Sequence, residues 1–244
     1  MGKTALITGA SRGIGKACAV RLAEKGFNII VNYNSNKEAA EKTASEVTSL
    51  GRNALTVQAD TSDLKQVQDM FRTAVREFGS VDVLVNNAGV VNDAYLLMLN
   101  AESLKKSLDI NIMGYFNCAQ QAALKMMKNR SGKIINISSV SSVHALVGQS
   151  VYSATKGAVN SMTANLAKEL APYGIQVNAV APGFVETEMI NSIPEEKLRE
   201  YLEAIPMKRF ATAKEVAETV SLLADGTLSY MTGQVLILDG GLSL

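Results

Sequence analysis

The sequence predicts an α/β fold of the doubly wound type, in which about seven parallel strands carry helices on both faces. Short β-branched runs alternate with longer amphipathic stretches along the whole chain, and this alternation requires crossover helices between parallel strands. Most of the short runs are continuously apolar, as burial on both faces of a sheet requires. The 244 residues contain no internal repeat, low-complexity tract or Pro/Gly-rich linker. We therefore expect residues 1–244 to form a single domain.

The individual elements follow from the same pattern. Ser35 with Glu38, and Thr212 with Glu215, have the spacing of a capping box, and Gly51 stands where a helix should end. The predicted strands are 3–8, 28–32, 54–59, 81–86, 133–138, 176–180 and 234–238. The predicted helices are 13–25, 36–50, 62–78, 102–129, 152–171 and 213–224.

Residues 186–210 interrupt this alternation. We predict one or two helices there, with Pro194 near the start of one, and no strand. An insertion late in such a fold, on the side where the strands end, is expected to form a helical lid over a site. An ordinary packed helical excursion is the alternative.

Composition excludes several kinds of partner. The chain has 24 Lys+Arg against 23 Asp+Glu, so it lacks the basic surplus that binds nucleic acid or an anionic membrane surface. No run of about 18 apolar residues predicts a membrane span. Cys18 and Cys118 lie in helix-like stretches without metal-ligand spacing. We expect buried thiols, no metal site, no signal peptide and a cytoplasmic protein.

A glycine-rich segment, Thr8-Gly9-Ala10-Ser11-Arg12-Gly13-Ile14-Gly15, joins the first strand to the first helix. Glycine lets the chain turn sharply, lets a pyrophosphate approach the backbone and lets the helix pack closely on the strand. The N–H groups at the helix start then favour the anion. The spacing is G-x-x-x-G-x-G rather than the commoner G-x-G-x-x-G. Its place in an alternating chain predicts a cofactor-binding loop formed by Gly9, Ser11, Arg12, Gly13, Ile14 and Gly15.

This segment, together with Asn86-Asn87-Ala88-Gly89, Tyr152-x-x-x-Lys156 and Pro182-Gly183, resembles the short-chain dehydrogenase/reductase family. The resemblance extends to the terminal Asp239-Gly240-Gly241 and implies a Rossmann-type fold and an NAD(P)-dependent oxidoreductase. Within the family the chain is most similar to the 3-oxoacyl-[acyl-carrier-protein] reductases. That similarity is carried by Pro206-Met207-Lys208-Arg209-Phe210 and Tyr230-Met231-Thr232-Gly233-Gln234.

The resemblance also implies cofactor contacts. It puts Asp60 beside the adenine, although Asp60 would also suit the N-terminus of a helix. It puts Asn87 and Gly89 beside the ribose, while Asn86 could instead brace the sheet through hydrogen bonds. The other expected contacts are Asn34, Thr61, Ala88, Tyr152, Lys156, Pro182, Gly183, Val185 and Thr187.

The end of the second strand bears on the choice of cofactor. NAD-preferring relatives carry an acidic residue near this point that binds the ribose hydroxyls. Here the nearby positions are Tyr33, Asn34 and Ser35. Arg12 could pair with a 2′-phosphate through charge-assisted hydrogen bonds, so we expect NADP(H).

Tyr152 is the candidate proton donor. Hydride transfer to a carbonyl leaves negative charge on oxygen, which a proton must neutralise. The usual donor is scarce because His144 is the only histidine. A tyrosine pKa of about 10 holds its proton tightly, and a neighbouring ammonium lowers it. Of two Tyr-x-x-x-Lys pairs, the one at Tyr33 closes a strand, whereas Tyr152 and Lys156 begin a helix, on which residues four apart share a face.

The resemblance supplies two partners for this pair. Ser139, thirteen residues before Tyr152, is expected to hold the substrate carbonyl. Asn111 matches the family asparagine that interrupts a long helix and holds a water on the proton path to Lys156, and a plain helix kink is its alternative role. Spacing alone leaves three rivals to Ser139, namely Ser138, Ser141 and Ser142.

The resemblance implies reduction of a ketone to a secondary alcohol, foremost 3-oxoacyl-[acyl-carrier-protein] to 3-hydroxyacyl-[acyl-carrier-protein] in fatty acid synthesis. Arg130 occupies a position that is basic in similar reductases, beside the entrance for an acidic carrier protein. Tyr173 stands where arginine is frequent, and the loop 147–151 also departs from the reductase pattern. Acetoacetyl-CoA, a quinone or a free secondary alcohol are therefore alternatives, as is a non-catalytic NADP-binding regulator. His144 would shape the substrate side or be a solvated loop residue.

The family resemblance also implies a homotetramer. Its contacts would form on the long helices 102–129 and 152–171 and on the last strand.

Overall fold

One parallel seven-stranded sheet forms the centre of the computed structural model, which describes residues 2–187 and 195–244. The strand order is β3-β2-β1-β4-β5-β6-β9, and each neighbouring pair is parallel. The strands are β1 Thr4–Ile7, β2 Asn28–Tyr33, β3 Ala54–Gln58, β4 Val83–Asn86, β5 Gly132–Ile137, β6 Ile175–Pro182 and β9 Val235–Leu238. The predicted doubly wound α/β fold is confirmed.

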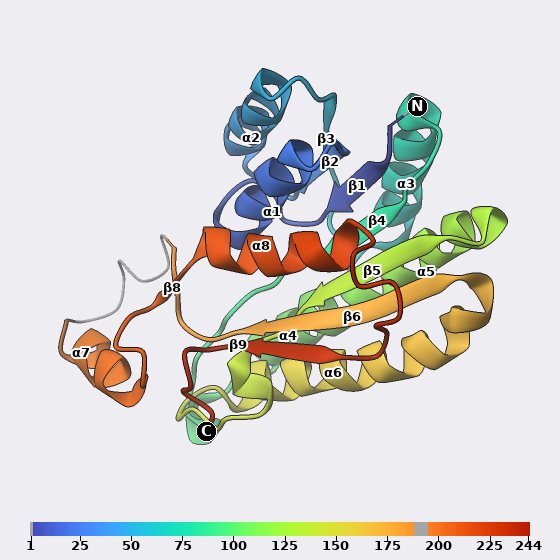
Figure 1. Cartoon of the computed structure of the whole chain (residues 1–244). Helices are drawn as coiled ribbons and strands as arrows, with labels where there is room; N and C mark the ends of the chain where they lie inside the picture. Colours follow the sequence, from blue (N-terminus) through green and yellow to red (C-terminus); the bar gives the residue numbers. More distant parts are fainter. Residues whose placement is uncertain (1, 188–194) are drawn as a thin grey trace.

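Helices cover both faces of the sheet (Figure 1). Successive strand residues alternate between two apolar clusters: Ile7 packs with Leu22 of α1, whereas Leu6 packs with Phe71 of α3. Burial on both faces is therefore the reason why the strands are continuously apolar. The helices are α1 Gly13–Glu24, α2 Lys37–Ser49, α3 Leu64–Phe78, α4 Ala101–Leu108, α5 Gly114–Asn129, α6 Ser150–Leu170, α7 Glu195–Ala204 and α8 Ala213–Ala224, with short 3₁₀ turns at Leu96–Met98, Val140–Ser142 and Ala171–Tyr173.

The helix predicted over 102–129 is interrupted. A π-helical turn at Asp109–Met113 separates α4 from α5, and Asn111 within it is fully buried. Such single π turns insert an extra residue into a helix and are frequent at functional sites. The interruption that the family resemblance implied for Asn111 is therefore present.

One of the two predicted capping boxes is wrong. The N-cap of α2 is Asn36, whose side chain accepts a hydrogen bond from the Ala39 N–H. Asn36 is as good a cap as Ser35, and it lies one residue nearer to the first helical turn. The predicted pairing of Ser35 with Glu38 is therefore not formed.

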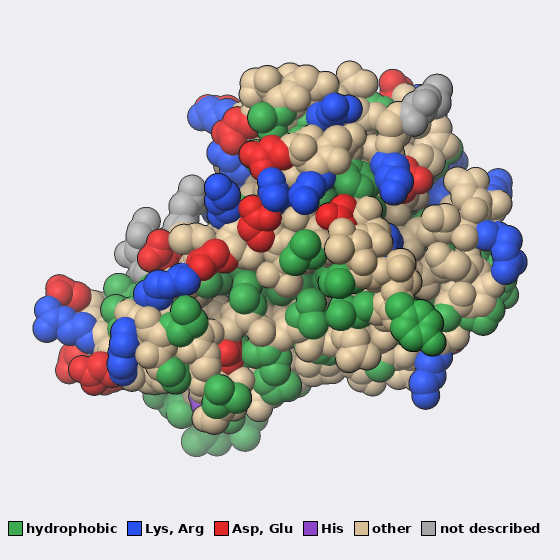
Figure 2. Space-filling view, viewed as in Figure 1, with side chains coloured by type: hydrophobic (Ala, Val, Ile, Leu, Met, Phe, Trp, Pro, Cys, Tyr) green, Lys and Arg blue, Asp and Glu red, His purple; other side chains and the backbone are tan. Residues whose placement is uncertain are grey.

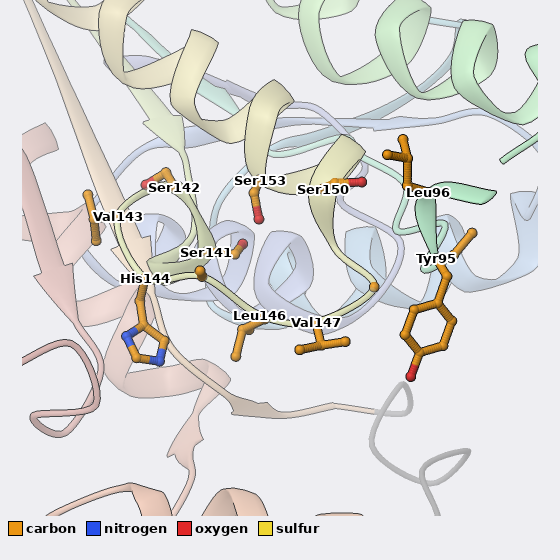
Figure 3. A pocket seen from close by; sticks show the side chains of 13 residues that line it. Tyr95, Leu96, Ser141, Ser142, Val143, His144, Leu146, Val147, Ser150 and Ser153 are labelled. Carbon is orange, nitrogen blue, oxygen red and sulfur yellow. The ribbon is translucent and has the colours of Figure 1, made fainter. Parts of the chain in front are cut away.

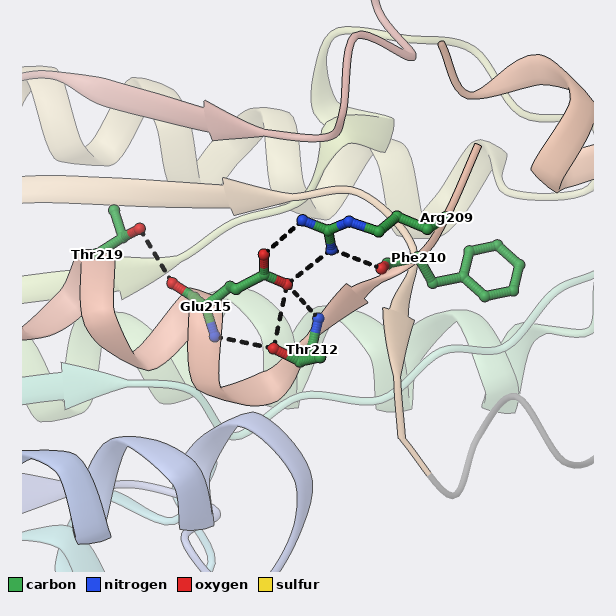
Figure 4. Close-up of polar contacts among 5 residues, drawn as sticks. All are labelled: Arg209, Phe210, Thr212, Glu215 and Thr219. Atoms are coloured by element: carbon green, nitrogen blue, oxygen red, sulfur yellow. Dashed lines mark hydrogen bonds and ion pairs between the residues drawn. The ribbon is translucent and has the colours of Figure 1, made fainter. Parts of the chain in front are cut away.

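The capping box of α8 is confirmed. The Thr212 N–H donates to the Glu215 carboxylate over 2.8 Å, and the Glu215 N–H donates to the Thr212 hydroxyl over 3.2 Å. Arg209 adds an ion pair of 2.6 Å to the same carboxylate (Figure 4). Three groups thus close the N-terminus of α8.

The excursion near residues 186–210 contains α7, as predicted, but a short ladder brackets it. β7, Val185–Glu186, pairs with β8, Ala211–Thr212, so a strand overlaps the segment predicted to have none only at Glu186. This two-stranded ladder joins the two ends of the excursion to each other. α7 also packs through Tyr201 on Phe184, with ring centroids 4.3 Å apart. Pro194 lies outside the described residues.

Cys18 and Cys118 are buried free thiols, as predicted. No helix in the described part of the chain is both long and apolar enough to cross a membrane.

Candidate active site

The candidate site lies where the strand order reverses, between β1 and β4. Loops that follow the carboxyl ends of parallel strands form the ligand crevice at this point in doubly wound folds. Here the loop after β4 supports the loop after β1. The Asn87 side chain donates to the carbonyls of Thr8 and Gly9 over 2.9 Å and 3.1 Å, and the Thr8 hydroxyl accepts from the N–H of Asn87 and of Ala88.

Glycine is required in the loop after β1 for two separate reasons. Gly9 has a φ of +61°, a conformation that other residues rarely adopt. Gly15 has no room for a side chain, because a Cβ there would lie 2.4 Å from the Gly9 carbonyl oxygen and 2.5 Å from the Asn87 side chain. The segment therefore brings helix and loop close together, as the glycine spacing predicted.

The N-terminus of α1 is open. Arg12 at its N-cap makes no side-chain cap hydrogen bond, whereas α2, α3, α4 and α8 each begin with a side-chain cap. Uncapped N–H groups at a helix start attract an anion. The arrangement fits the pyrophosphate of a dinucleotide, which the first turn of α1, from Gly13 to Gly15, would hold.

Other predicted cofactor residues gather around this loop. A Cβ on Gly13 would lie 3.6 Å from the Thr187 side chain. The loop after β6 therefore lies close to the start of α1. A Cβ on Gly89 would lie 3.3 Å from Asn111 and 3.8 Å from Lys156. The loops after β1, β4 and β6 and the helix α6 thus face one region, which also includes Pro182, Gly183 and Val185 at and beyond the end of β6.

Three further predicted cofactor contacts, Asp60, Thr61 and Asn34, lie at or after the ends of β2 and β3. Asp60 precedes α3, whose N-cap is Asp63, and its carboxylate accepts from Ser62. Thr61 is buried, and its hydroxyl lies against Gly114 of α5. Asn34 is exposed at the end of β2. Because Asp63 is the cap, Asp60 does not have the helix-terminal role that was its alternative.

Asn86 braces the sheet. Its side chain donates to Asn136 over 3.0 Å and to the Tyr115 carbonyl over 3.3 Å, and Asn136 donates in turn to Thr163 over 2.9 Å. These buried amides satisfy one another across β4, β5 and α6.

Contacts separate Ser139 from its three rivals. The Ser138 hydroxyl donates to Asn160 over 2.6 Å, and Asn160 donates to Ser142 over 2.8 Å, so both serines are bound to α6. Ser141 donates its hydroxyl to Ser139 over 2.8 Å. Ser139 itself is hydrogen-bonded to the Tyr152 side chain. Of the four serines, Ser139 is thus the one paired with the candidate proton donor.

Lys156 is buried beside Tyr152. Its Nζ lies 5.7 Å from the centre of the Tyr152 ring. It donates to the Ile137 carbonyl over 2.7 Å and to the Tyr115 hydroxyl over 3.0 Å. Residues 152 and 156 therefore share one face of α6, as the spacing of four predicted.

Burial dominates the electrostatics of this pair. Loss of solvent raises the pKa of Tyr152 to about 12, against a smaller lowering by the Ser139 hydrogen bond. Loss of solvent also lowers the pKa of Lys156 to about 7, because burial disfavours each charged form. The predicted lowering of the Tyr152 pKa by Lys156 is therefore wrong for the chain alone.

Asn111 connects three parts of the site. Its side chain accepts from the Val90 N–H over 2.8 Å and donates to the Val90 carbonyl over 2.9 Å. It also donates to Thr155 of α6 over 3.2 Å. The amide thus holds the π turn against the loop after β4 and against the turn of α6 that precedes Lys156.

A cavity of about 540 Å³ lies between the segment that follows Ser139 and the start of α6. It is lined by the 3₁₀ turn after Ser139, the following loop with His144, Leu146 and Val147, the start of α6, and Tyr95 and Leu96. Figure 3 shows His144, Leu146, Val147 and Tyr95 on one side of the loop. The lining is mainly apolar, so it suits a short hydrocarbon better than a charged group. His144 lines this cavity and is partly exposed, so a role on the substrate side and that of a solvated loop residue both stay predictions.

Arg130 and Tyr173 lie elsewhere. Arg130 donates to the Pro172 carbonyl over 2.7 Å, beside the starts of β5 and β6. Ser139 follows the opposite end of β5, and a six-residue strand spans about 20 Å. The expectation that Arg130 flanks the entrance is therefore wrong within a single chain.

The described residues include no group of three or more His, Cys, Asp or Glu side chains placed to hold a metal ion.

Comparison with known proteins identifies the family. Residues 9–243 match the family model described as Enoyl-(Acyl carrier protein) reductase. The chain is 43% identical over 242 residues to the 3-oxoacyl-[acyl-carrier-protein] reductase FabG of Staphylococcus aureus, covering 99% of this chain and 98% of that protein. This chain belongs to the short-chain dehydrogenase/reductase family. It is thus a member of an oxidoreductase family whose enzymes use a nicotinamide cofactor.

Solved structures agree with the family. A doubly substituted mutant of a short-chain dehydrogenase/reductase from Serratia marcescens superposes with a TM-score of 0.95 at 36% identity, covering 99% of this chain and 98% of that one. The acetoin dehydrogenase YohF from Salmonella typhimurium gives a TM-score of 0.91 at 37% identity, with 99% and 96% coverage.

Sequence reasoning missed Tyr115 and Asn160. Both are polar residues on helices, and neither belongs to a motif with a fixed spacing. A tyrosine within a buried helix face usually needs a partner for its hydroxyl, which was the available signal for Tyr115. Asn160, eight residues after Tyr152, gave no comparable signal.

Proposed function

We propose that the protein reduces the 3-oxo group of an acyl-[acyl-carrier-protein] to the 3-hydroxy form with NADPH, a step of fatty acid synthesis. The observation that carries the proposal is the 43% identity over 99% of the chain to a 3-oxoacyl-[acyl-carrier-protein] reductase. The contacts among Ser139, Tyr152 and Lys156 support it, because they provide the groups that a carbonyl reduction needs. One domain would carry both the cofactor and the substrate sites.

The chain's own residues would handle the proton and the carbonyl. NADPH, held at the start of α1, supplies the hydride when bound. Ser139 orients the ketone oxygen by a hydrogen bond, and Tyr152 donates its proton to that oxygen. The raised pKa of Tyr152, about 12, keeps the phenol protonated at neutral pH, and Lys156 stabilises the phenolate that donation leaves. Asn111 would hold the water that returns a proton through Lys156.

The preference for the phosphorylated cofactor is supported by the loops around the ribose. β2 ends at a buried Tyr33, followed by Asn34 and Ser35 without a carboxylate. Arg12 stands at the N-cap of α1, where a guanidinium could bind a 2′-phosphate in bidentate fashion.

A second candidate is the oxidoreduction of a small free ketone or secondary alcohol. Two acetoin dehydrogenases, from Salmonella typhimurium and Enterobacter cloacae, are 37% and 39% identical to this chain over 99% of its length. The apolar lining near Leu146 and Val147 is compatible with such a substrate as well as with a short acyl group.

We further propose a cytoplasmic homotetramer that meets acyl carrier protein as its substrate carrier. Apolar side chains are exposed on α5, at Phe116 and Leu124, and near the last strand, at Tyr230 and Ile237. Figure 2 shows hydrophobic side chains gathered over β9 and the lower edge of α8. Exposed apolar patches of this kind favour contact with another protein surface.

Turnover assays test the proposal. Purified enzyme is given acetoacetyl-[acyl-carrier-protein], acetoacetyl-CoA or diacetyl, each with NADPH and with NADH. We expect the highest kcat/KM with the carrier-linked substrate and NADPH. A higher kcat/KM for diacetyl would favour the second candidate, and NADPH binding without any turnover would indicate a non-catalytic regulator.

A further inference from the structure

A second phenol stands beside Lys156, and the proposed chemistry does not use it. Tyr115 lies on α5 with 1% of its surface exposed. Its hydroxyl is 3.0 Å from Lys156 Nζ and 2.8 Å from the Ile137 carbonyl, which also accepts from Lys156 over 2.7 Å. These three groups therefore form a closed triangle of hydrogen bonds.

The direction of these bonds follows from the donors present. The Tyr115 hydroxyl has one proton, and the Ile137 carbonyl can only accept, so that proton is donated to Ile137. The oxygen lone pairs of Tyr115 then remain for Lys156, which donates. An ammonium has three N–H groups, so two of them are held by Tyr115 and Ile137 and the third is left for the active site.

We propose that Tyr115 is a positioning residue for Lys156: its hydroxyl fixes the amine at the site and favours the ammonium form. This inference rests on the proposed function, in which Lys156 stabilises the phenolate of Tyr152. Tyr115 is not among the residues that line the cavity, and it acts through Lys156.

The ammonium form of Lys156 needs hydrogen-bond acceptors from the protein because the side chain is buried. Burial lowers the pKa of Lys156 to about 7, and a hydrogen bond to the charged form opposes that effect. Burial raises the pKa of Tyr115 well above its usual value, so Tyr115 remains a neutral acceptor. The titratable groups that face this cluster are Tyr152 on the same helix as Lys156, Cys118 beside Tyr115 on α5, and Asp93, which acts on Tyr152 from the loop after β4.

The inference predicts a specific effect on pH dependence. Without the Tyr115 hydroxyl the ammonium loses an acceptor, so the pKa of Lys156 falls. The phenolate of Tyr152 is then less stabilised, so the pKa of Tyr152 rises. Ketone reduction needs the Lys156 ammonium to stabilise the phenolate that proton donation leaves, so its rate falls as pH rises through the pKa of Lys156, about 7.

The test is the Tyr115→Phe variant, assayed for reduction of a 3-oxoacyl thioester with NADPH from about pH 5 to about pH 9. We expect the falling limb of kcat to move down by about one pH unit, so that kcat stays within about twofold of the wild type at about pH 5 and falls about tenfold above about pH 8. Ser221→Ala is the matched control, because Ser221 is also fully buried and donates to a backbone carbonyl, that of Glu218. Its profile should equal that of the wild type.

An unchanged profile, or an equal loss of rate at every pH, would overturn the inference, since the latter is what simple destabilisation produces. If Tyr115→Phe lowers the folded fraction, Tyr115→Met removes the same hydroxyl with a more adaptable side chain and must give the same shift. Tyr152→Phe is assayed alongside. If it retains activity, the proposed function fails; if it is inactive while Tyr115→Phe keeps the wild-type profile, only this inference fails.

Discussion

The first helix and the last begin in opposite ways, although both cover the same face of the sheet (Figure 1) and Arg21 of α1 pairs with Glu218 of α8 over 2.8 Å. α8 starts with a capping box closed by Thr212 and Glu215. α1 starts without a side-chain cap. A cap contributes about 1 kcal/mol to stability, whereas open N–H groups attract an anion. α6 also begins without a side-chain cap, so the glycine-rich loop before α1 is what distinguishes its N-terminus as the proposed phosphate site.

A substitution at Gly15 should disturb the N-terminus of α1 the most. In Gly15→Ala the new Cβ would meet the Gly9 carbonyl at 2.4 Å, so the loop must move. We expect a loss of about 2 kcal/mol in stability and a fall of about thirtyfold or more in NADPH affinity, measured by thermal unfolding and by calorimetric titration. Gly157→Ala is the control, because its Cβ would meet nothing within 4 Å. Equal cofactor affinity in both variants would contradict the assignment of this loop.

Arg12 sharpens the comparison, because it is the side chain at the N-cap of the open end. In Arg12→Ala we expect KM for NADPH to rise about tenfold and KM for NADH to change little, since one charge-assisted contact to a 2′-phosphate is lost. Lys16→Ala on the same helix is the control, because Lys16 pairs with Glu46. Parallel changes for both cofactors would mean that Arg12 does not bind the phosphate.

The closed end predicts a smaller effect, on stability alone. Hydrogen bonds from Arg209 and Thr212 lower the pKa of Glu215 from 4.5 to about 2. A lowered folded-state pKa gives stability that is complete above the unfolded pKa and is lost as pH falls from 4.5 towards about 2. In this window we expect wild-type stability to fall more steeply than that of Glu215→Gln, followed by urea unfolding. Identical slopes would show that the carboxylate charge does not stabilise α8, and activity at neutral pH should be unchanged.

The N-termini of α1 and α8 also show which features the sequence could predict. Residues such as Gly9 and Gly15 encode the backbone geometry locally. The sequence therefore predicted the loop after β1 together with the strand before it and the helix after it. The capping box at Thr212 was predicted for the same reason, whereas Asn36 displaced Ser35 because two good caps stood side by side.

Protonation could not be predicted in this way. A spacing of four placed Tyr152 and Lys156 on one face of α6, but it carries no information on burial. Burial reverses the expected direction of the Tyr152 pKa. Tyr115 lies on another helix, and its contact with Lys156 forms only when the chain folds. Asn160 lies outside any motif, and its contact with Ser138 likewise forms only in the folded protein.

The claim that most depends on this geometry is that the Tyr152 phenol delivers the proton. In Tyr152→Phe, calorimetric titration should give an NADPH affinity close to that of the wild type, because the loop after β1 is intact. Ketone reduction, followed by NADPH absorbance, should fall about a thousandfold. A variant that binds NADPH and reduces the ketone at near wild-type rates would contradict the account.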